Sequence, residues 1–199
     1  MELYECWNIG GHTLEYLDDI HVYLCDGVKV KSITQVLKHR FGNKYDGVDQ
    51  ATLKRASEAG TQMHQIIQDW CEKGIESDLV ELRNFKFLQN QYGFNVIENE
   101  VPVILSVDDE PVCAGRLDMV IMMDDKVGIA DLKRTSTLDK EYLGYQTNLY
   151  RIAYRQTYGI EADFLRAIHL REDTRKFVNI PVNEPLAMDL VYEYMRGAT

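Results

Sequence analysis

The residue types best suited to chemistry fall in one stretch, residues 115–133. It opens with Gly-Arg-Leu-Asp118 and closes with Asp131-Leu-Lys133. If the Asp-Asp pair at 124–125 forms a two-residue turn, the hairpin register places Asp118 opposite Asp131, with Cβ atoms about 5 Å apart. Lys133 then projects from the same face as Asp131, because side chains alternate along a strand.

This arrangement matches the needs of phosphodiester hydrolysis. Two carboxylates that face each other across apolar strands repel, and a divalent cation between them supplies the missing charge. A bound cation lowers the pKa of water and polarises a phosphate. The Lys133 ammonium would orient the attacking water or stabilise charge in the transition state. The alternative is a pair of surface acids on a twisted hairpin, and a longer turn would break the register.

Further candidate ligands lie upstream of this hairpin. His64 ends the segment Gly-Thr-Gln-Met-His and has apolar neighbours, so it is either a metal ligand or an ordinary core or surface histidine. Glu100 lies on the strand before Asp118, and Glu98 lies two residues earlier on the same face. Either glutamate supplies a third acid, or both face solvent.

A line of polar aromatic residues follows the hairpin. Gln146 and Tyr150 are one helical turn apart and share a face, and Tyr142, Tyr154 and Tyr158 continue the line at four-residue spacing. Such a stripe packs in a core, or its hydroxyl and amide groups bind phosphate or hold Lys133.

Local signals predict the elements that position these residues. Alternation at 12–17 and 20–25, with a turn signal at Asp26-Gly27 before 28–30, indicates a small N-terminal β-meander. Ser32 is predicted to cap a short helix that reaches Arg40. Asp49 is predicted to cap a longer helix that ends at Gly74.

The remaining periodicity predicts a mixed α/β order. We expect a helix at 76–91, strands at 94–105, 112–123 and 127–132, and a helix from Asp139 to about Tyr158. Strands at 162–170 and 176–180 and a helix at 183–195 complete the chain. Without an internal repeat or a linker, residues 1–199 are predicted to form one domain.

Charge limits how the chain can meet nucleic acid. It carries 22 Lys and Arg against 32 Asp and Glu, a net charge of -10. This balance opposes nonspecific attraction to polyphosphate, so any contact must be local. Basic residues cluster at 29–44, 54–55, 133–134 and 166–176, and each cluster is either a solvated face or a binding surface.

The expected cellular compartment follows from the absence of membrane-spanning and signal segments in the sequence. No apolar run reaches the roughly 20 residues that span a bilayer, and residues 1–10 do not resemble a signal peptide. Four cysteines, at 6, 25, 71 and 113, stand apart without a CxxC pair. We expect a soluble, cytoplasmic protein without membrane partners, with reduced and mostly buried thiols.

In combination, five elements in order carry a family resemblance. GTxxH, a Glu, GRLD, DLK and QxxxY, spread from His64 to Tyr150, resemble the RecB-like and lambda-exonuclease-like branch of the PD-(D/E)xK nuclease superfamily. The N-terminal hairpin followed by Lys-Ser-Ile-Thr-Gln-Val-Leu-Lys looks like phage and prophage members of that group. The resemblance implies a restriction-endonuclease-like core, in which helices flank a central mixed β-sheet preceded by an N-terminal β-hairpin.

The resemblance also implies roles for individual residues. It implies Mg2+ or Mn2+ bound by His64, Asp118, Asp131 and the main-chain carbonyl of Leu132, with Lys133 as the catalytic lysine. Glu100 matches an acid that supports the metal site or a second metal. Gln146 and Tyr150 match a motif that positions DNA and the lysine. Some relatives hold an iron-sulfur cluster on cysteines near the C-terminus, but the last cysteine here is Cys113, so no cluster is expected.

The leading expectation is therefore a metal-dependent DNA nuclease. An exonuclease of phage-type recombination or DNA processing, acting on DNA ends, is favoured over a site-specific endonuclease. A homo-oligomer or a recombination partner protein would help an acidic chain grip DNA. Two other hypotheses stay open: a non-cleaving module that binds DNA ends or protein, and a structural phage protein whose acids face solvent.

Overall fold

The computed structural model describes residues 4–42 and 47–197. Five α-helices occur in these ranges: α1 (Ile33–Phe41), α2 (Gln50–Lys73), α3 (Val80–Tyr92), α4 (Lys140–Tyr158) and α5 (Glu184–Gly197). Nine strands accompany them: β1 (Tyr4–Ile9), β2 (His12–Leu17), β3 (Val22–Cys25), β4 (Val28–Ser32), β5 (Asn95–Val107), β6 (Glu110–Met123), β7 (Lys126–Lys133), β8 (Phe164–Arg171) and β9 (Thr174–Ile180). The mixed α/β class is confirmed.

The predicted helix caps are present. Ser32 and Gln35 form a capping box, in which the Ser32 hydroxyl accepts the Gln35 N–H and the Gln35 side-chain oxygen accepts the Ser32 N–H. Asp49 accepts a hydrogen bond from the Thr52 N–H at the start of α2, and Asp139 accepts one from Tyr142 at the start of α4. These side chains satisfy N–H groups that lack a partner within the helix, and so fix where α1, α2 and α4 begin.

Several predicted boundaries were off by two or more residues, and two of them have a local cause. The helix expected from Glu76 begins at Val80, because the Ser77 hydroxyl accepts the Leu79 N–H in a local turn that competes with the helix. The strand expected from Ile20 begins at Val22, because residues 18–20 form a 3-10 turn and His21 takes a left-handed conformation.

The N-terminal part is larger than the predicted hairpin. β1, which was not predicted, pairs antiparallel with β2, and β2, β3 and β4 follow as a meander. Its inner face packs against β5 and β6 through a core that includes Leu14, Tyr16 and Ala114. The last residues of the basic cluster at 29–44 lie outside the described residues.

β6 is the centre of the sheet, and one of its edges is shared by two strands. β5 pairs antiparallel along most of the first edge. On the other edge β4 pairs in parallel with residues 113–114, and β7 pairs antiparallel with residues 119–123. Residues 115–118 therefore have no strand partner on this edge among the described residues. The sheet continues from β7 to β8 and β9.

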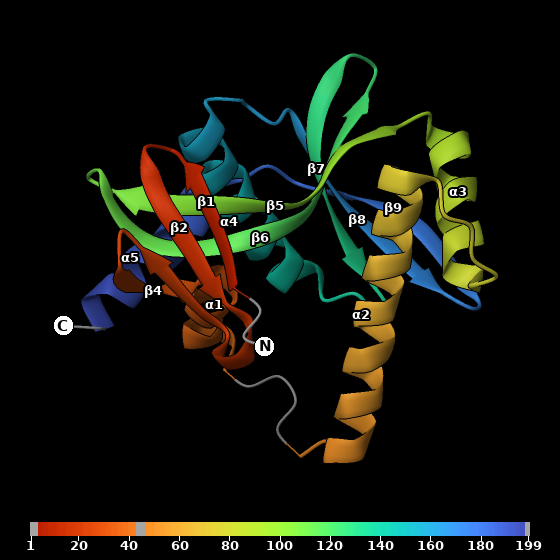
Figure 1. Ribbon diagram of the computed structural model, residues 1–199, viewed down its shortest axis with the longest axis horizontal. Helices are drawn as coiled ribbons and strands as arrows, with labels where there is room; N and C mark the ends of the chain where they lie inside the picture. The colour runs from red at the N-terminus through yellow and green to blue at the C-terminus, as the bar shows by residue number, and fades with distance from the viewer. Residues whose placement is uncertain (1–3, 43–46, 198–199) are drawn as a thin grey trace.

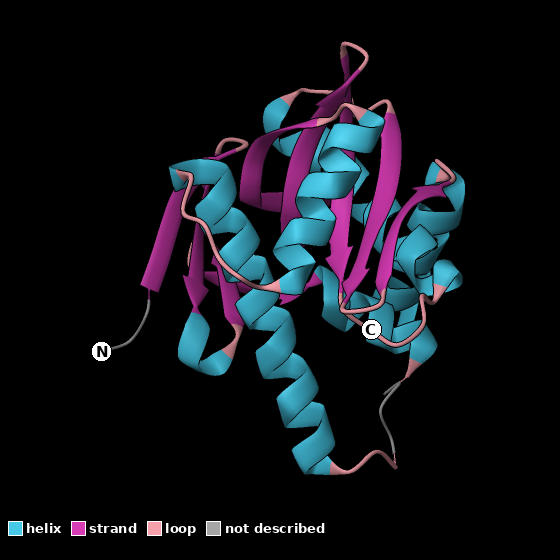
Figure 2. Cartoon of the chain, turned by 90° about the vertical axis from the view of Figure 1, so that its right-hand side faces the viewer, coloured by secondary structure: helices cyan, strands magenta, loops and turns pink. Residues whose placement is uncertain are grey.

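Helices cover both faces of this sheet. One core cluster lies between the strands and α1, α4 and α5, and a second lies between the strands and α2 and α3. Figure 2 shows α2 and α3 crossing the same face, and Figure 1 shows α4 behind the strands. The N-terminal half of α2 extends beyond the sheet, and most of its residues from 50 to 58 are exposed.

The outer edge of β5 is closed by side chains of α4 instead of a strand. The Thr157 hydroxyl accepts the Ile104 N–H and lies 3.2 Å from the Ile104 carbonyl oxygen. The Gln156 amide bonds both backbone groups of Ser106, and the Tyr158 hydroxyl donates to the Pro102 carbonyl. Side chains thus supply the partners that a neighbouring strand would supply, which protects an edge that could otherwise pair with another chain.

The expectation of mostly buried thiols holds only in part. Cys25 and Cys113 are buried free thiols, whereas Cys71 is partly exposed and Cys6 is exposed. Within the described residues, no helix is both long enough and apolar enough to cross a membrane.

We predict that Thr157→Val destabilises the protein by about 1–3 kcal/mol, because it leaves the buried Ile104 N–H and C=O without partners while preserving side-chain shape. Thr147→Val is the matched control. The Thr147 hydroxyl is also buried but donates only to the Leu143 carbonyl within α4, so its loss should cost less. Urea unfolding of both variants measures the difference, and equal costs would contradict this account of the edge.

Candidate metal centre

The β6–β7 hairpin has the predicted register. Met123 pairs with Lys126 and the ladder runs to Met119 opposite Ala130, one position before Asp118 and Asp131. The turn residues Asp124 and Asp125 have φ of 52° and 58°, as a tight hairpin turn requires. The next pair in this register is Asp118 and Asp131, as predicted, but here the two strands diverge.

The Asp118 carboxylate occupies the place where the strands separate. Its Oδ2 accepts the Leu132 N–H at 2.6 Å, so a side chain replaces the missing backbone partner. Its other oxygen, Oδ1, lies 3.8 Å from Nδ1 of His64. The divergence of β6 and β7 thus turns one carboxylate oxygen toward the backbone and the other toward α2.

Glu100 lies opposite Asp118 on β5, between the pairs Asn99–Met119 and Val101–Leu117. Its φ is 50°, a left-handed conformation that is unfavourable for glutamate within a strand. Opposite Glu100, the two faces of β6 exchange. Leu117 packs in the core beneath α4, whereas Met119 packs beneath α2 and α3. A regular strand would keep these two residues on one face. Strain of this kind concentrates at functional sites.

His64 joins the two acids from α2. Its Nε2 lies 3.2 Å from the Leu132 carbonyl oxygen, and because a carbonyl only accepts, Nε2 carries a proton. Its Nδ1 faces Glu100 Oε1 at 3.6 Å. Burial disfavours protonation of His64, but the carboxylates of Asp118 and Glu100 outweigh it and raise its pKa to about 9.

Asp131 and Lys133 form the buried end of the site. Asp131 is 2% exposed, and its Oδ2 lies 2.6 Å from the Lys133 ammonium without a well-directed hydrogen bond. Burial raises the pKa of Asp131 to about 6, since Lys133 counters it only in part and Asp118 adds repulsion. Burial lowers the pKa of Lys133, but Asp131 and Asp118 more than offset this, so the lysine stays charged.

Gln146 and Tyr150 pack beside these charges from α4. Both are buried, and the burial of Tyr150 raises the pKa of its hydroxyl well above its usual value. Oε1 of Gln146 has no hydrogen-bond partner among the described residues. The Tyr150 ring packs directly on Gly115, where a Cβ would lie 3.0 Å from a ring carbon, so the first residue of the GRLD segment must be small.

Arg116 is a site residue that sequence reasoning missed. Its Nε lies 3.0 Å from Glu100 and its NH1 donates to Glu5 at 2.8 Å. It therefore holds Glu100 in place and neutralises part of its charge. The signal was available, because Arg116 lies two residues before Asp118 and strand alternation would direct both toward one face.

Two further contacts that were not predicted anchor the segment after Lys133. The Arg134 Nε donates to the buried carboxylate of Glu81 on α3 at 2.7 Å. Nε2 of the buried His169 on β8 donates to the Thr135 carbonyl at 2.6 Å. Both partners come from distant parts of the chain, so no local pattern reveals them. They fix the direction in which β7 leaves the sheet, and with it the position of Lys133.

Cavities open on two sides of the cluster. A cavity of about 530 Å³ is lined by His64, Glu100 and Arg116 and faces α2. A second, of about 560 Å³, is lined by Lys133, Gln146 and the loop at 135–139 and faces α1. His64 and Glu100 thus line the first cavity, and Lys133 lines the second.

The residues present fit a divalent cation. One ligand atom each from His64, Glu100 and Asp118 lie within 4.8 Å of one another. Carboxylate oxygens with one imidazole suit Mn2+ or Mg2+. The predicted ligands His64, Asp118 and the Leu132 carbonyl come together, and Glu100 joins them in place of Glu98, which is exposed. The nearest charge to Asp131 is Lys133, and Asp131 is not part of the three-residue group.

Comparisons with known proteins leave the function open. We found no protein family whose sequence profile matches the chain and no similar curated protein. Among solved structures 22 chains are similar. One, described as the crystal structure of SSO0001, is 15% identical with a TM-score of 0.39, and the match covers 82% of this chain and 83% of that one. At this degree of likeness, neither fold nor function transfers.

We predict that Glu100→Gly separates stability from metal binding. Glycine adopts the left-handed conformation freely, which relieves about 1 kcal/mol of strain, and repulsion with Asp118 disappears. The thermal midpoint in EDTA should therefore equal or exceed that of the wild type, while Mn2+ affinity measured by calorimetry falls about tenfold or more. The control is Glu98→Gly, which should lower the midpoint and leave the affinity unchanged. A reversed pattern would argue against a ligand role for Glu100.

We also predict that Mn2+ stabilises the folded chain through this cluster. At 100 times its Kd, the ion should add about 2.7 kcal/mol, or about 5–10 °C in thermal midpoint. Asp118→Asn should remove most of this gain. A second group of potential ligands, His12, Cys25 and Asp26, lies in the meander. The gain should persist in His12→Ala, and its loss there instead would assign the metal to the meander.

Proposed function

We propose that this protein is a metal-dependent nuclease that hydrolyses phosphodiester bonds in DNA. The observation that carries the proposal is the convergence of His64, Glu100 and Asp118 within 4.8 Å of one another beside the buried Asp131–Lys133 pair. These groups come from α2, β5, β6 and β7. Packing requires no such gathering of acids, and their mutual repulsion opposes it.

Under this proposal each residue has a distinct task. His64, Glu100 and Asp118 would hold the cation, with Asp131 beside them on the Lys133 side. When bound, the cation would lower the pKa of a water molecule and polarise the scissile phosphate. His64 would bind through Nδ1, because Nε2–H is held by the Leu132 carbonyl, a common way to fix the orientation of a ligand histidine.

Lys133 would act on the reacting groups directly. Its ammonium is held by Asp131, whose position is fixed by burial in the sheet, so it offers a preorganised positive charge at little cost in reorganisation. From there it can orient the attacking water or stabilise the charge that develops on the phosphate. Gln146 and Tyr150 border this pair on α4 and would position Lys133 and the DNA strand.

The finer assignment follows from the motif order. The helices on both faces of a mixed sheet, and the order of His64, Glu100, Asp118, the Asp-Leu-Lys segment and Gln146, support a restriction-endonuclease-like core of the RecB-like and lambda-exonuclease-like type. An exonuclease acting on DNA ends in recombination or processing is the form we favour. Because the chain has a net charge of -10, we propose that a second copy or a recombination partner helps it to bind DNA.

Cleavage of end-labelled linear DNA and closed circular DNA, with Mg2+, Mn2+ or EDTA, tests the proposal. Lys133→Ala should lower the rate about 100-fold or more, the scale for losing one group that stabilises a transition state. Lys126→Ala, an exposed lysine on the same strand, should leave the rate unchanged.

The two substrates separate the outcomes. Loss of linear DNA alone would identify an exonuclease, and nicking of the circle would identify an endonuclease. Absence of cleavage by folded, metal-loaded protein would instead favour a module that binds DNA ends or protein without cutting.

A further inference from the structure

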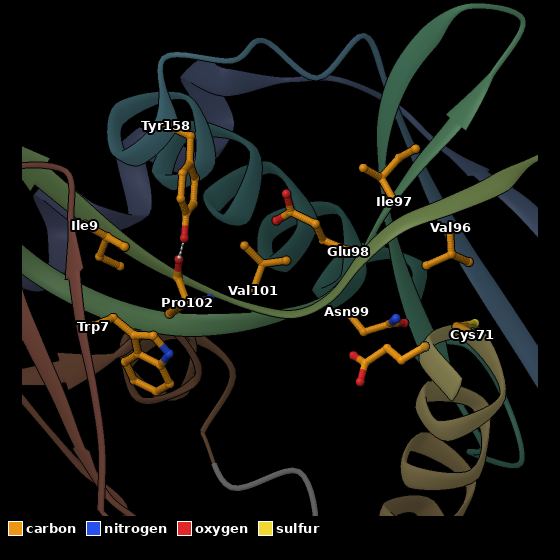
Figure 3. A pocket seen from close by; sticks show the side chains of 11 residues that line it. Trp7, Ile9, Cys71, Val96, Ile97, Glu98, Asn99, Val101, Pro102 and Tyr158 are labelled. Carbon is orange, nitrogen blue, oxygen red and sulfur yellow. Dashed lines mark hydrogen bonds between the residues drawn. The ribbon is translucent and has the colours of Figure 1, made fainter. Parts of the chain in front are cut away.

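A continuous groove leads away from the metal cluster on the α2 side. The cavity that contains His64 and Glu100 is also lined by Trp7 and Asn99. The same two residues line a further cavity of about 430 Å³, which continues along β5 to Tyr158. Figure 3 shows Trp7 and Asn99 on either side of this second part. We call the two cavities together the Trp7 groove.

Beyond the metal cluster, the Trp7 groove is unsuited to phosphate. Four glutamates line it, namely Glu5, Glu72, Glu98 and Glu100. Its basic lining residues are His64 and Arg116, and both already lie against the carboxylates of Glu5, Glu100 or Asp118. At the Tyr158 end, a sugar–phosphate backbone would lie against the exposed carboxylates of Glu72 and Glu98, and the lining of that cavity includes no basic residue.

The cavity on the opposite side of the cluster has the reverse character. Lys38 and Lys133 line it, together with the hydroxyl groups of Thr34, Thr135, Ser136 and Thr137. Asp139 also lines it, and its carboxylate caps α4 by accepting the Tyr142 N–H. Ammonium and hydroxyl groups are the usual partners of phosphate oxygens. A strand that crosses the cluster therefore has one favourable orientation, with its backbone toward Lys133 and its bases toward the Trp7 groove.

The remaining lining groups match nucleobases. The amides of Gln65, Gln68 and Asn99 both donate and accept, as base edges do. The Trp7 indole lies at the junction of the two cavities and is only partly buried, so a planar partner can reach it. Aromatic side chains beside a strand path are the usual platforms for unpaired bases.

We propose that the Trp7 groove holds the unpaired bases of single-stranded DNA, with Trp7 as the stacking platform. The inference rests on the proposed nuclease function and adds the class of substrate. Paired bases do not fit this arrangement, because the complementary strand would bring its own phosphates against the exposed carboxylates of Glu72 and Glu98. The acidic groove thus selects for single strands or single-stranded ends.

Tryptophan fluorescence provides a direct test, because the chain has two tryptophans. Trp70 packs edge-to-face against the buried Phe85, with the Lys86 ammonium over its ring, so bound DNA should quench Trp7 alone. The titration uses Lys133→Ala protein with Mg2+, so that DNA is not consumed. The probes are an oligothymidylate of about 12 nucleotides and a blunt hairpin duplex of similar length.

We expect the single strand to quench the fluorescence and to bind more tightly than the duplex. Adding Trp7→Ala should weaken single-strand binding about 5- to 150-fold, the loss of one stacked base, and Trp7→Phe should restore much of it. The matched control Trp70→Phe should keep both the quenching and the affinity. A merely structural role for Trp7 would lower thermal stability without this dependence on an aromatic ring.

The failures of the two proposals can be told apart. If the protein cleaves DNA but Trp7→Ala binds the single strand as tightly as its parent, or the blunt duplex binds more tightly than the single strand, the inference about the groove is overturned and the nuclease proposal stands. If folded, metal-loaded wild type neither binds nor cleaves either substrate, both proposals fall together.

Discussion

Repulsion among three carboxylates limits how this site can be built, and the surrounding elements are arranged to offset it. Glu100 and Asp118 are partly exposed and Asp131 is buried beside them, and unit charges 4 Å apart interact by about 4 kcal/mol at an effective dielectric of about 20. The chain opposes this with three cationic groups, each from a different element: His64 from α2, Arg116 from β6 and Lys133 from β7. The balance is electrostatic, but its geometry is held by the two core clusters that clamp the sheet from both faces.

The sheet creates room for these charges by an irregularity at its centre. β4 and β7 share one edge of β6 and leave residues 115–118 without a strand partner on that side. Opposite them, Glu100 has a left-handed conformation, and the faces of β6 exchange between Leu117 and Met119. A regular ladder would have paired the backbone N–H and C=O groups of residues 115–118 with a neighbouring strand. The interruption leaves backbone and side chains free to face α2 on one side and α4 on the other.

The sequence was most informative where the determining interactions are local. The Asp124-Asp125 turn sets the register that aligns Asp118 with Asp131, and Ser32, Asp49 and Asp139 set the starts of three helices. It was least informative where partners are distant. Glu81 and His169 fix the exit of β7 through residues far along the chain. The conformation of Glu100 follows from the packing of both faces, and no propensity of glutamate would predict it.

Helix α4 connects the segment after Lys133 to the edge of the sheet, and this fixes the length of the helix. Its start lies beside the loop after Lys133, its middle presents Gln146 and Tyr150 to the site, and its last turn closes β5 through Thr157. Each residue added or removed would rotate everything beyond it by about 100° and shift it by about 1.5 Å. Insertions and deletions between residues 146 and 157 would therefore break one end or the other. Divergence in this helix should proceed by substitution alone, whereas the exposed start of α2 is free to change in length.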